Sequence, residues 1–125
     1  MSEGVFVFDG RLDGAFLESV YEGDMEHAEM VFDQFLRTIP GQLNEIKDYY
    51  QNSDIENFRK NVHKIKPVLS YVGLTSLTDK ASLLEKECKQ VGSIQDVSGL
   101  YSSFSTELNA MIPIIENELT KIRNL

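Results

Sequence analysis

The stretch "DIENFRKNVHKIKPVLSYV", residues 54–72, decides the fold, because its apolar residues recur at intervals of three, four, three, four and three positions. An α-helix has 3.6 residues per turn, so this spacing places them in one stripe along one side of a helix. Such a stripe is typical of a helix packed in a bundle. It consists of Ile55, Phe58, Val62, Ile65, Leu69 and Val72. We predict a helix over about 54–72, with Ser53 or Asp54 as its N-cap and Gly73 at its end.

Four further segments show the same helical spacing of apolar residues. They cover about 13–21, 25–51, 75–91 and 94–123, and their predicted N-caps include Asp13, Asp24 and Ser93. The strand-like stretch "VFVF" at 5–8 is too short and isolated to form a sheet. Short turns join the four longer helices, so sequential neighbours run antiparallel and bury their stripes against one another. We predict an all-α, up-down-up-down four-helix bundle in one domain, residues 1–125, with a short additional N-terminal helix across one end.

Composition and charge exclude several classes of protein. The chain has 125 residues, 42% of them apolar, which is enough for a globular core. A net charge of -8 disfavours nucleic acid as a partner, since phosphate binding relies on Lys and Arg. No apolar run is long enough to span a membrane, and the N-terminus does not read as a signal peptide. The single cysteine, Cys88, excludes an internal disulfide and a metal site built from cysteines, so we expect a reducing, cytoplasmic location.

His63 lies roughly 130° from the centre of the apolar stripe, so it is predicted to face solvent or a partner. A neutral imidazole is a nucleophile with no charge that repels an incoming phosphoryl group. Lys66 follows three residues later, where it can hold a phosphoryl oxygen. The surrounding segment carries four of the twelve basic residues of the chain: Arg59, Lys60, Lys64 and Lys66. Taken alone, however, a surface histidine among lysines most often belongs to an ordinary solvent-exposed helix face that carries no site.

The segment "HKIKPVLSYVGLTSL", residues 63–77, resembles the motif of histidine-containing phosphotransfer (HPt) domains. The motif positions are occupied by His63, Ile65, Lys66, Val72, Gly73 and Leu77. Glu85 stands where this family commonly has Leu-Glu on the following helix. The resemblance extends over roughly 10–122, and the fold it implies is the predicted bundle. The sequence departs from the family at Pro67, which replaces a usual glycine, and at 68–69, where small residues are usual.

The resemblance implies a phosphorelay intermediary, a carrier more than an enzyme. His63 would be the phosphoacceptor and Lys66 would stabilise the phosphoryl group. The partners expected are response-regulator receiver domains and a hybrid sensor histidine kinase. No bound cofactor is expected, because the Mg²⁺ needed would belong to the receiver, and nothing in the sequence demands more than a monomer. The docking surface would comprise the following residues of the 54–72 and 75–91 helices: Arg59, Lys60, Lys64, Pro67, Ser70, Ser82, Glu85 and Lys89.

Several alternatives stay open. The altered residues at 67–69 leave room for an interaction module that docks receivers or a kinase without carrying phosphate. Pro67, which cannot donate a backbone N–H to the His63 carbonyl, would bend the helix and tilt the imidazole, or would only curve the helix around the core. One flank of the 75–91 helix, with Thr78, Ser82, Glu85 and Lys89, would face the partner, or would form an ordinary polar face. A metal-binding bundle is rejected, since His27 and His63 are the only histidines and are not suitably arranged.

Overall fold

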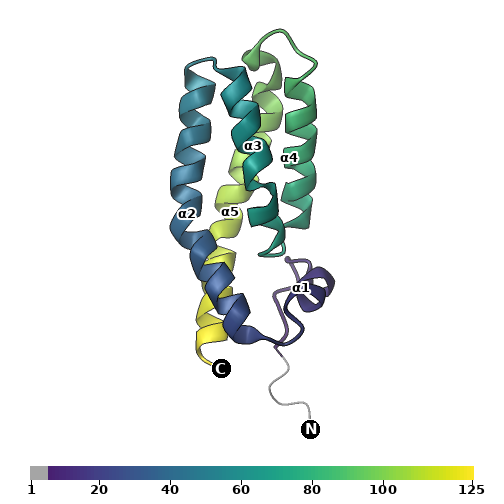
Figure 1. Cartoon of the computed structure of the whole chain (residues 1–125), viewed down its shortest axis with the longest axis vertical. Helices are drawn as coiled ribbons and strands as arrows, with labels where there is room; N and C mark the ends of the chain where they lie inside the picture. Colours follow the sequence, from purple (N-terminus) through teal and green to yellow (C-terminus); the bar gives the residue numbers. More distant parts are fainter. Residues whose placement is uncertain (1–5) are drawn as a thin grey trace.

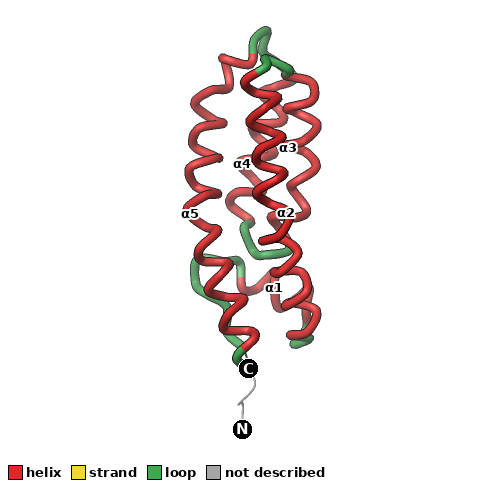
Figure 2. The backbone as a smooth tube through the Cα atoms, turned by 90° about the vertical axis from the view of Figure 1, so that its left-hand side faces the viewer, coloured by secondary structure: helices red, strands yellow, loops and turns green. Residues whose placement is uncertain are grey.

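The computed structural model describes residues 6–125, and those residues form a bundle of helices with no strand. The elements in chain order are α1 (Gly14–Tyr21), α2 (Met25–Gln51), α3 (Ile55–Ser70), α4 (Thr75–Cys88), the 3₁₀ helix η1 (Ile94–Val97) and α5 (Ser98–Arg123). The four long helices pack in a ring in which α3 contacts α2 and α4, and α5 closes the ring behind them (Figure 1). Figure 2 shows the same elements from a view turned by 90°, with α1 at the end of the bundle where the C-terminus lies. The predicted up-down-up-down four-helix bundle with an additional N-terminal helix is confirmed.

Aspartate caps set where the first three helices begin. Asp13, Asp24 and Asp54 each accept a hydrogen bond from the backbone N–H three residues further on, at 3.1, 3.1 and 3.2 Å. A side-chain acceptor at this position satisfies one of the N–H groups that the first turn leaves without a partner. Of the two residues predicted to cap α3, the structure therefore uses Asp54. Ser53 instead adopts a left-handed backbone conformation in the turn before it.

Two predicted helices have different bounds in the structure. α4 ends at Cys88 rather than near 91, and the last α-helix begins at Ser98 rather than near 94. Residues 94–97 form the 3₁₀ helix η1, with Ser93 accepting the N–H of Gln95. A 3₁₀ helix has three residues per turn, which places Ile94 and Val97 on one face. Both side chains are buried, so the tighter helix packs both of them against the bundle.

The apolar stripe of α3 forms the centre of the core. Phe58, Val62, Ile65 and Leu69 are at most 1% exposed, and Val72 beyond the helix end is buried as well. Val62 and Ile65 lie on either side of His63 in the sequence, so their burial sets the rotation of α3 about its axis. Facing side chains from the other helices complete the core, among them Phe32, Phe35, Ile39, Leu84, Phe104, Leu108 and Ile115.

The N-terminal segment packs against the lower end of the bundle. The ring of Phe8 stacks on Phe32 of α2 with 5.9 Å between ring centroids. The backbone N–H of Asp9 donates to the fully buried Glu118 carboxylate of α5 at 2.9 Å, and Lys121 pairs with the same carboxylate at 2.6 Å. Val5, the first residue of the stretch "VFVF", lies outside the described residues. No helix within 6–125 has the length and apolar character needed to cross a membrane.

Gly73 lets this N-terminal segment approach the turn between α3 and α4. Its φ of +81° lies in the left-handed region, which favours glycine. A Cβ at this position would lie 2.7 Å from Leu17 Cδ1 and 3.0 Å from Leu12 Cβ. The backbone N–H of Asp13 donates to the Gly73 carbonyl at 2.9 Å. Gly73 is therefore required both by its own conformation and by the close packing of α1.

We expect Gly73→Ala to lower the free energy of unfolding by about 2–5 kcal/mol. A left-handed alanine costs about 1–2 kcal/mol, and forcing a methyl group into packed atoms costs about 1–3 kcal/mol. Urea denaturation measures the change. Gly41→Ala is the matched control, because a Cβ there meets no atom within 4 Å in the middle of α2. That control should stabilise the protein by up to about 1 kcal/mol, and equal effects of the two substitutions would contradict the role given to Gly73.

Candidate functional site

His63 lies on the outward side of α3, and its side chain is 63% exposed. The core packing of Val62 and Ile65 fixes this orientation, because adjacent residues on a helix point about 100° apart. The side chain of His63 therefore points away from the core, as the helical period predicts. An exposed imidazole on a rigid helix is accessible to a large partner without any loop having to move.

The imidazole is held by a carboxylate of the neighbouring helix. Glu85 of α4 is 8% exposed, and its Oε2 lies 2.8 Å from His63 Nδ1. An ionised carboxylate can only accept hydrogen bonds, so Nδ1 carries the hydrogen and donates it. In a neutral imidazole the other ring nitrogen, Nε2, then holds the free electron pair. The contact thus selects one tautomer and fixes the direction of the ring.

The second oxygen of the same carboxylate binds Lys66. Lys66 Nζ lies 2.7 Å from Glu85 Oε1 and 3.4 Å from the hydroxyl oxygen of Ser82. Burial of the Glu85 carboxyl acts to raise its pKa, but the hydrogen bonds and charges of Lys66 and His63 outweigh burial and leave the pKa below its ordinary value of 4.5. Glu85 is therefore ionised at neutral pH and joins the histidine to the lysine.

An open groove of about 540 Å³ lies beside the imidazole, between α3 and α4. We call it the His63 groove. Its lining consists of His63, Lys64, Lys66, Pro67, Ser70, Thr78 and Ser82. The Thr78 hydroxyl donates to the Leu74 carbonyl at 3.1 Å, so the 3.1 Å contact between Ser70 and Thr78 is donated by Ser70. Three hydroxyl side chains and two lysines therefore line the space next to the imidazole ring.

The predicted site residues divide into three groups. Lys66, Ser82 and Glu85 form the connected cluster at His63, and Lys64, Pro67 and Ser70 line the groove. Arg59, Lys60 and Lys89 lie outside the groove lining. Their contacts with a partner stay predictions.

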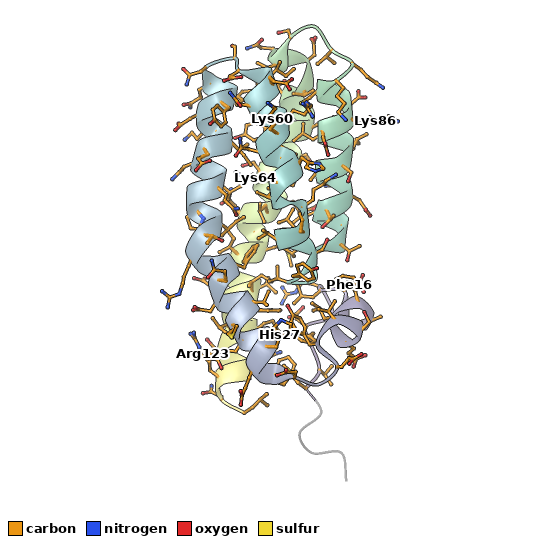
Figure 3. All side chains as sticks on the ribbon, in the orientation of Figure 1. Phe16, His27, Lys60, Lys64, Lys86 and Arg123 are labelled. Atoms are coloured by element: carbon orange, nitrogen blue, oxygen red, sulfur yellow. The ribbon has the colours of Figure 1, made fainter. Side chains whose placement is uncertain are left out.

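The remaining charged residues near the site lie at its margins. Arg59 pairs with Glu56 at 2.6 Å, and Lys60 lies 4.0 Å from the same carboxylate. Figure 3 shows Lys60 and Lys64 on one face of α3, above the level of His27 on α2. Lys89 is the C-cap residue of α4. Lys60, Lys64 and Lys89 are exposed and Arg59 is partly buried, and these cations provide positive charge around the groove within an acidic protein.

Two features of the cluster could not be predicted from the residues alone. Glu85 was assigned to the docking surface, yet its carboxylate faces His63 and Lys66 rather than solvent. Its position on α4 indicated nearness to the histidine, but which atoms meet depends on side-chain conformations across two helices. Thr78 is predicted on the same flank of the helix, but the groove that it lines forms only where α3 and α4 pack together.

Pro67 and His27, for which the sequence leaves more than one role open, each have a defined position in the structure. Pro67 lies inside α3 with its side chain exposed, and the helix continues through it to Ser70. The predicted tilt of the imidazole by Pro67 stays a prediction. His27 packs edge-on against Tyr21, with 5.0 Å between the rings. Over residues 6–125 no three His, Cys, Asp or Glu side chains are grouped so as to hold a metal ion.

Comparison with known proteins places this geometry in a family. The family model described as Hpt domain matches residues 30–124. Neither the curated proteins nor the solved structures contain a match to the chain. The matched residues include His63, Lys66 and Glu85, whereas α1 precedes them. Hpt domains interact with receiver domains and histidine kinases. The chain belongs to the Hpt domain family, whose helical bundles have a phosphotransfer role in two-component signalling.

Proposed function

We propose that the protein is a phosphorelay intermediary. His63 accepts a phosphoryl group from the aspartyl phosphate of one receiver domain and passes it to the aspartate of another. The observation that carries the proposal is the contact between His63 Nδ1 and Glu85, which leaves Nε2 as the free nucleophile on an exposed ring. The donor and acceptor are both proteins, so the site needs exposure and not an enclosed substrate pocket.

In the first step of the transfer, His63 Nε2 forms a bond to phosphorus while the bond from phosphorus to the aspartyl oxygen breaks. The receiver aspartate leaves as a carboxylate. The ring then carries hydrogen on Nδ1 and phosphorus on Nε2, so it gains positive charge. Glu85, at 2.8 Å from Nδ1, offsets that charge. In the second step a carboxylate oxygen of the next receiver attacks phosphorus, and the electron pair returns to Nε2.

Lys66 and Ser82 support the phosphoryl group in this proposal. An ammonium group has three hydrogens, and Lys66 directs two of them toward Glu85 and Ser82. Its third hydrogen is free to bind a phosphoryl oxygen. Ser82 accepts from Lys66, so its own hydroxyl hydrogen is free to donate to the phosphoryl group or to the docked receiver. The Mg²⁺ that neutralises further charge would be supplied by the receiver domain.

Charge around the groove suits an acidic partner. The chain as a whole carries a charge of -8, yet Lys60, Lys64 and Lys66 gather on α3 around His63. A basic area within an acidic surface orients a partner that carries a complementary acidic pocket, and it raises the rate of association. A receiver domain presents such a pocket around its phosphorylated aspartate. The proposed partners are therefore receiver domains, including that of a hybrid sensor kinase, docking on a monomer.

We expect His63→Gln to abolish labelling by phosphorylated receiver domains. Wild type should acquire acid-labile label when mixed with a panel of phosphorylated receivers, and the variant should acquire none. The side chain is 63% exposed and a glutamine amide can still donate to Glu85, so the free energy of unfolding should fall by no more than about 1 kcal/mol. If a receiver binds the wild-type protein but never labels it, the protein is an interaction module that does not carry phosphate.

Glu85→Gln should slow phosphoryl transfer about tenfold, which corresponds to an increase of about 1.4 kcal/mol in the activation free energy. The amide oxygen can still accept from Nδ1, but it no longer offsets the positive charge that develops on the ring. Single-turnover labelling from a phosphorylated receiver measures the rate. Glu45→Gln, an exposed position on α2, serves as the charge-matched control and should transfer at the wild-type rate. A wild-type rate for Glu85→Gln would show that Glu85 has no part in transfer.

The stability difference between wild type and Glu85→Gln should depend on pH. The pKa of Glu85 is lower in the folded protein than its ordinary value of 4.5, so its ionised form contributes stability above that pH. As the pH falls through the lowered pKa, the carboxylate is protonated and this contribution is lost. We expect a difference of about 1–3 kcal/mol at pH 7 that shrinks on acidification. Urea denaturation at a series of pH values measures it, and a difference independent of pH would contradict the assignment.

A further inference from the structure

The charges around His63 do not balance once the ring carries a phosphoryl group. In the proposed relay the Mg²⁺ stays with the receiver domain, so the protein holds the phosphoryl group without a metal between two receivers. Lys66 and Glu85 lie 2.7 Å apart, and their charges cancel each other. The phosphorylated ring gains one positive charge, whereas the phosphoryl group carries about two negative charges at neutral pH. About one negative charge is therefore left without a counter-charge.

Lys64 is the cation of the His63 groove that has no carboxylate partner. Two lysines line the groove, and one of them, Lys66, is engaged by Glu85. Within residues 6–125, no ion pair includes Lys64. The hydroxyl side chains of the lining can donate hydrogen bonds, but they carry no charge. The ammonium group of Lys64 is therefore free to pair with a new anion in the groove.

The other two cations of this part of α3 are less available. Arg59 and Lys60 lie about one turn before His63 and outside the groove lining. Both approach the Glu56 carboxylate, at 2.6 and 4.0 Å. That carboxylate offsets part of their charge, whereas no carboxylate offsets the charge of Lys64.

The side chain of Lys64 is long enough to turn toward a phosphoryl group on His63. Adjacent residues on a helix point about 100° apart, so Lys64 leaves α3 beside the imidazole and not over it. Its flexible stem of four carbons lets the ammonium group swing toward the groove that both residues line. Lys64 is exposed on α3 (Figure 3), so this movement displaces no buried side chain.

We infer that Lys64 binds the phosphoryl group on His63 while the protein carries it between receivers. The inference rests on the proposed function, because that function supplies the phosphorylated state. The ammonium group donates a charge-assisted hydrogen bond to a phosphoryl oxygen, on the side of the ring away from Lys66. A docked receiver brings its own Mg²⁺ to the same oxygens, so Lys64 acts chiefly after the receiver has left. Lys64 thereby sets how much of the phosphoryl group remains on the carrier at equilibrium.

The equilibrium constant for transfer tests this role separately from docking. A phosphorylated receiver domain is mixed with the protein until the label on the two proteins stops exchanging, and the label on each is then measured. This constant compares the free proteins, so a weaker docking contact slows the transfer and leaves the constant unchanged. We expect Lys64→Gln to shift the constant about fivefold to tenfold toward the phosphorylated receiver. Lys64→Arg keeps the charge and should stay within about twofold of wild type.

A second measurement needs no receiver. His63 is phosphorylated chemically with phosphoramidate, and the ³¹P resonance of the phosphohistidine is followed as a function of pH. A nearby cation favours the doubly charged phosphoryl group, so Lys64→Gln should raise the midpoint of this titration by up to about one pH unit. Salt at about 1 M should remove most of the difference, because it screens exposed charges.

The matched control is Lys47→Gln. Lys47 is exposed on α2 and lines the groove between α2 and α5, so this substitution removes the same charge from another part of the surface. Its equilibrium constant and its ³¹P titration should match those of wild type. An equal effect of Lys47→Gln would overturn the inference, since net charge alone would then explain the result. Wild-type values of both quantities for Lys64→Gln would overturn it too, even with slower transfer, because Lys64 would then act only in docking.

Two combined outcomes separate this inference from the proposed function. If phosphorylated receivers label His63 but neither quantity depends on Lys64, the proposed function stands and the inference fails. If no receiver labels His63 while the ³¹P titration of the chemically loaded protein depends on Lys64, the proposed function fails and the pairing of Lys64 with the phosphoryl group stands.

Discussion

The burial of one apolar stripe on α3 is the constraint on which the rest of the structure depends. Val62 and Ile65 are almost fully buried, and a rotation of the helix by one residue would carry them about 100° toward solvent. The orientation that buries both residues also turns His63 outward and Lys66 toward α4. The site is thus a direct consequence of core packing, and it occupies the middle of a rigid helix rather than a loop. A change that rotates α3 about its axis would therefore misplace the histidine.

The Glu85 carboxylate links the position of His63 on α3 to the orientation and tautomer of its ring. A buried carboxylate is costly unless donors surround it, and here both oxygens are bound, one by the imidazole and one by the ammonium group. The need to satisfy Glu85 therefore holds the histidine in one tautomer and keeps the lysine within reach of the same space. Structural stability and reactivity are joined in one set of contacts. This explains how a small bundle can carry a reactive group with no enclosed active site.

Much of this arrangement could be predicted from the sequence, because it follows from local rules. The spacing of apolar residues on α3, the three aspartate caps and the exposure of His63 all depend on the helical period and on nearby hydrogen bonds. The inward orientation of Glu85 could not be predicted, because it depends on how two helices pack. The 3₁₀ segment at 94–97 was assigned to a longer helix, since periods of 3.0 and 3.6 cannot be distinguished over four residues.

The close fit of the N-terminal segment over Gly73 determines which residues a stable fragment of this domain must contain. The stretch that matches the family begins within α2, yet Leu12, Leu17 and Phe8 fill space that this stretch cannot fill by itself. A fragment trimmed to residues 30–124 would expose Phe32 and remove the N–H that Asp9 donates to the buried Glu118. The minimal unit that keeps these contacts is therefore larger than the family match and includes Phe8 and Asp9. Grafting this domain into another signalling protein would require the N-terminal segment to travel with the bundle.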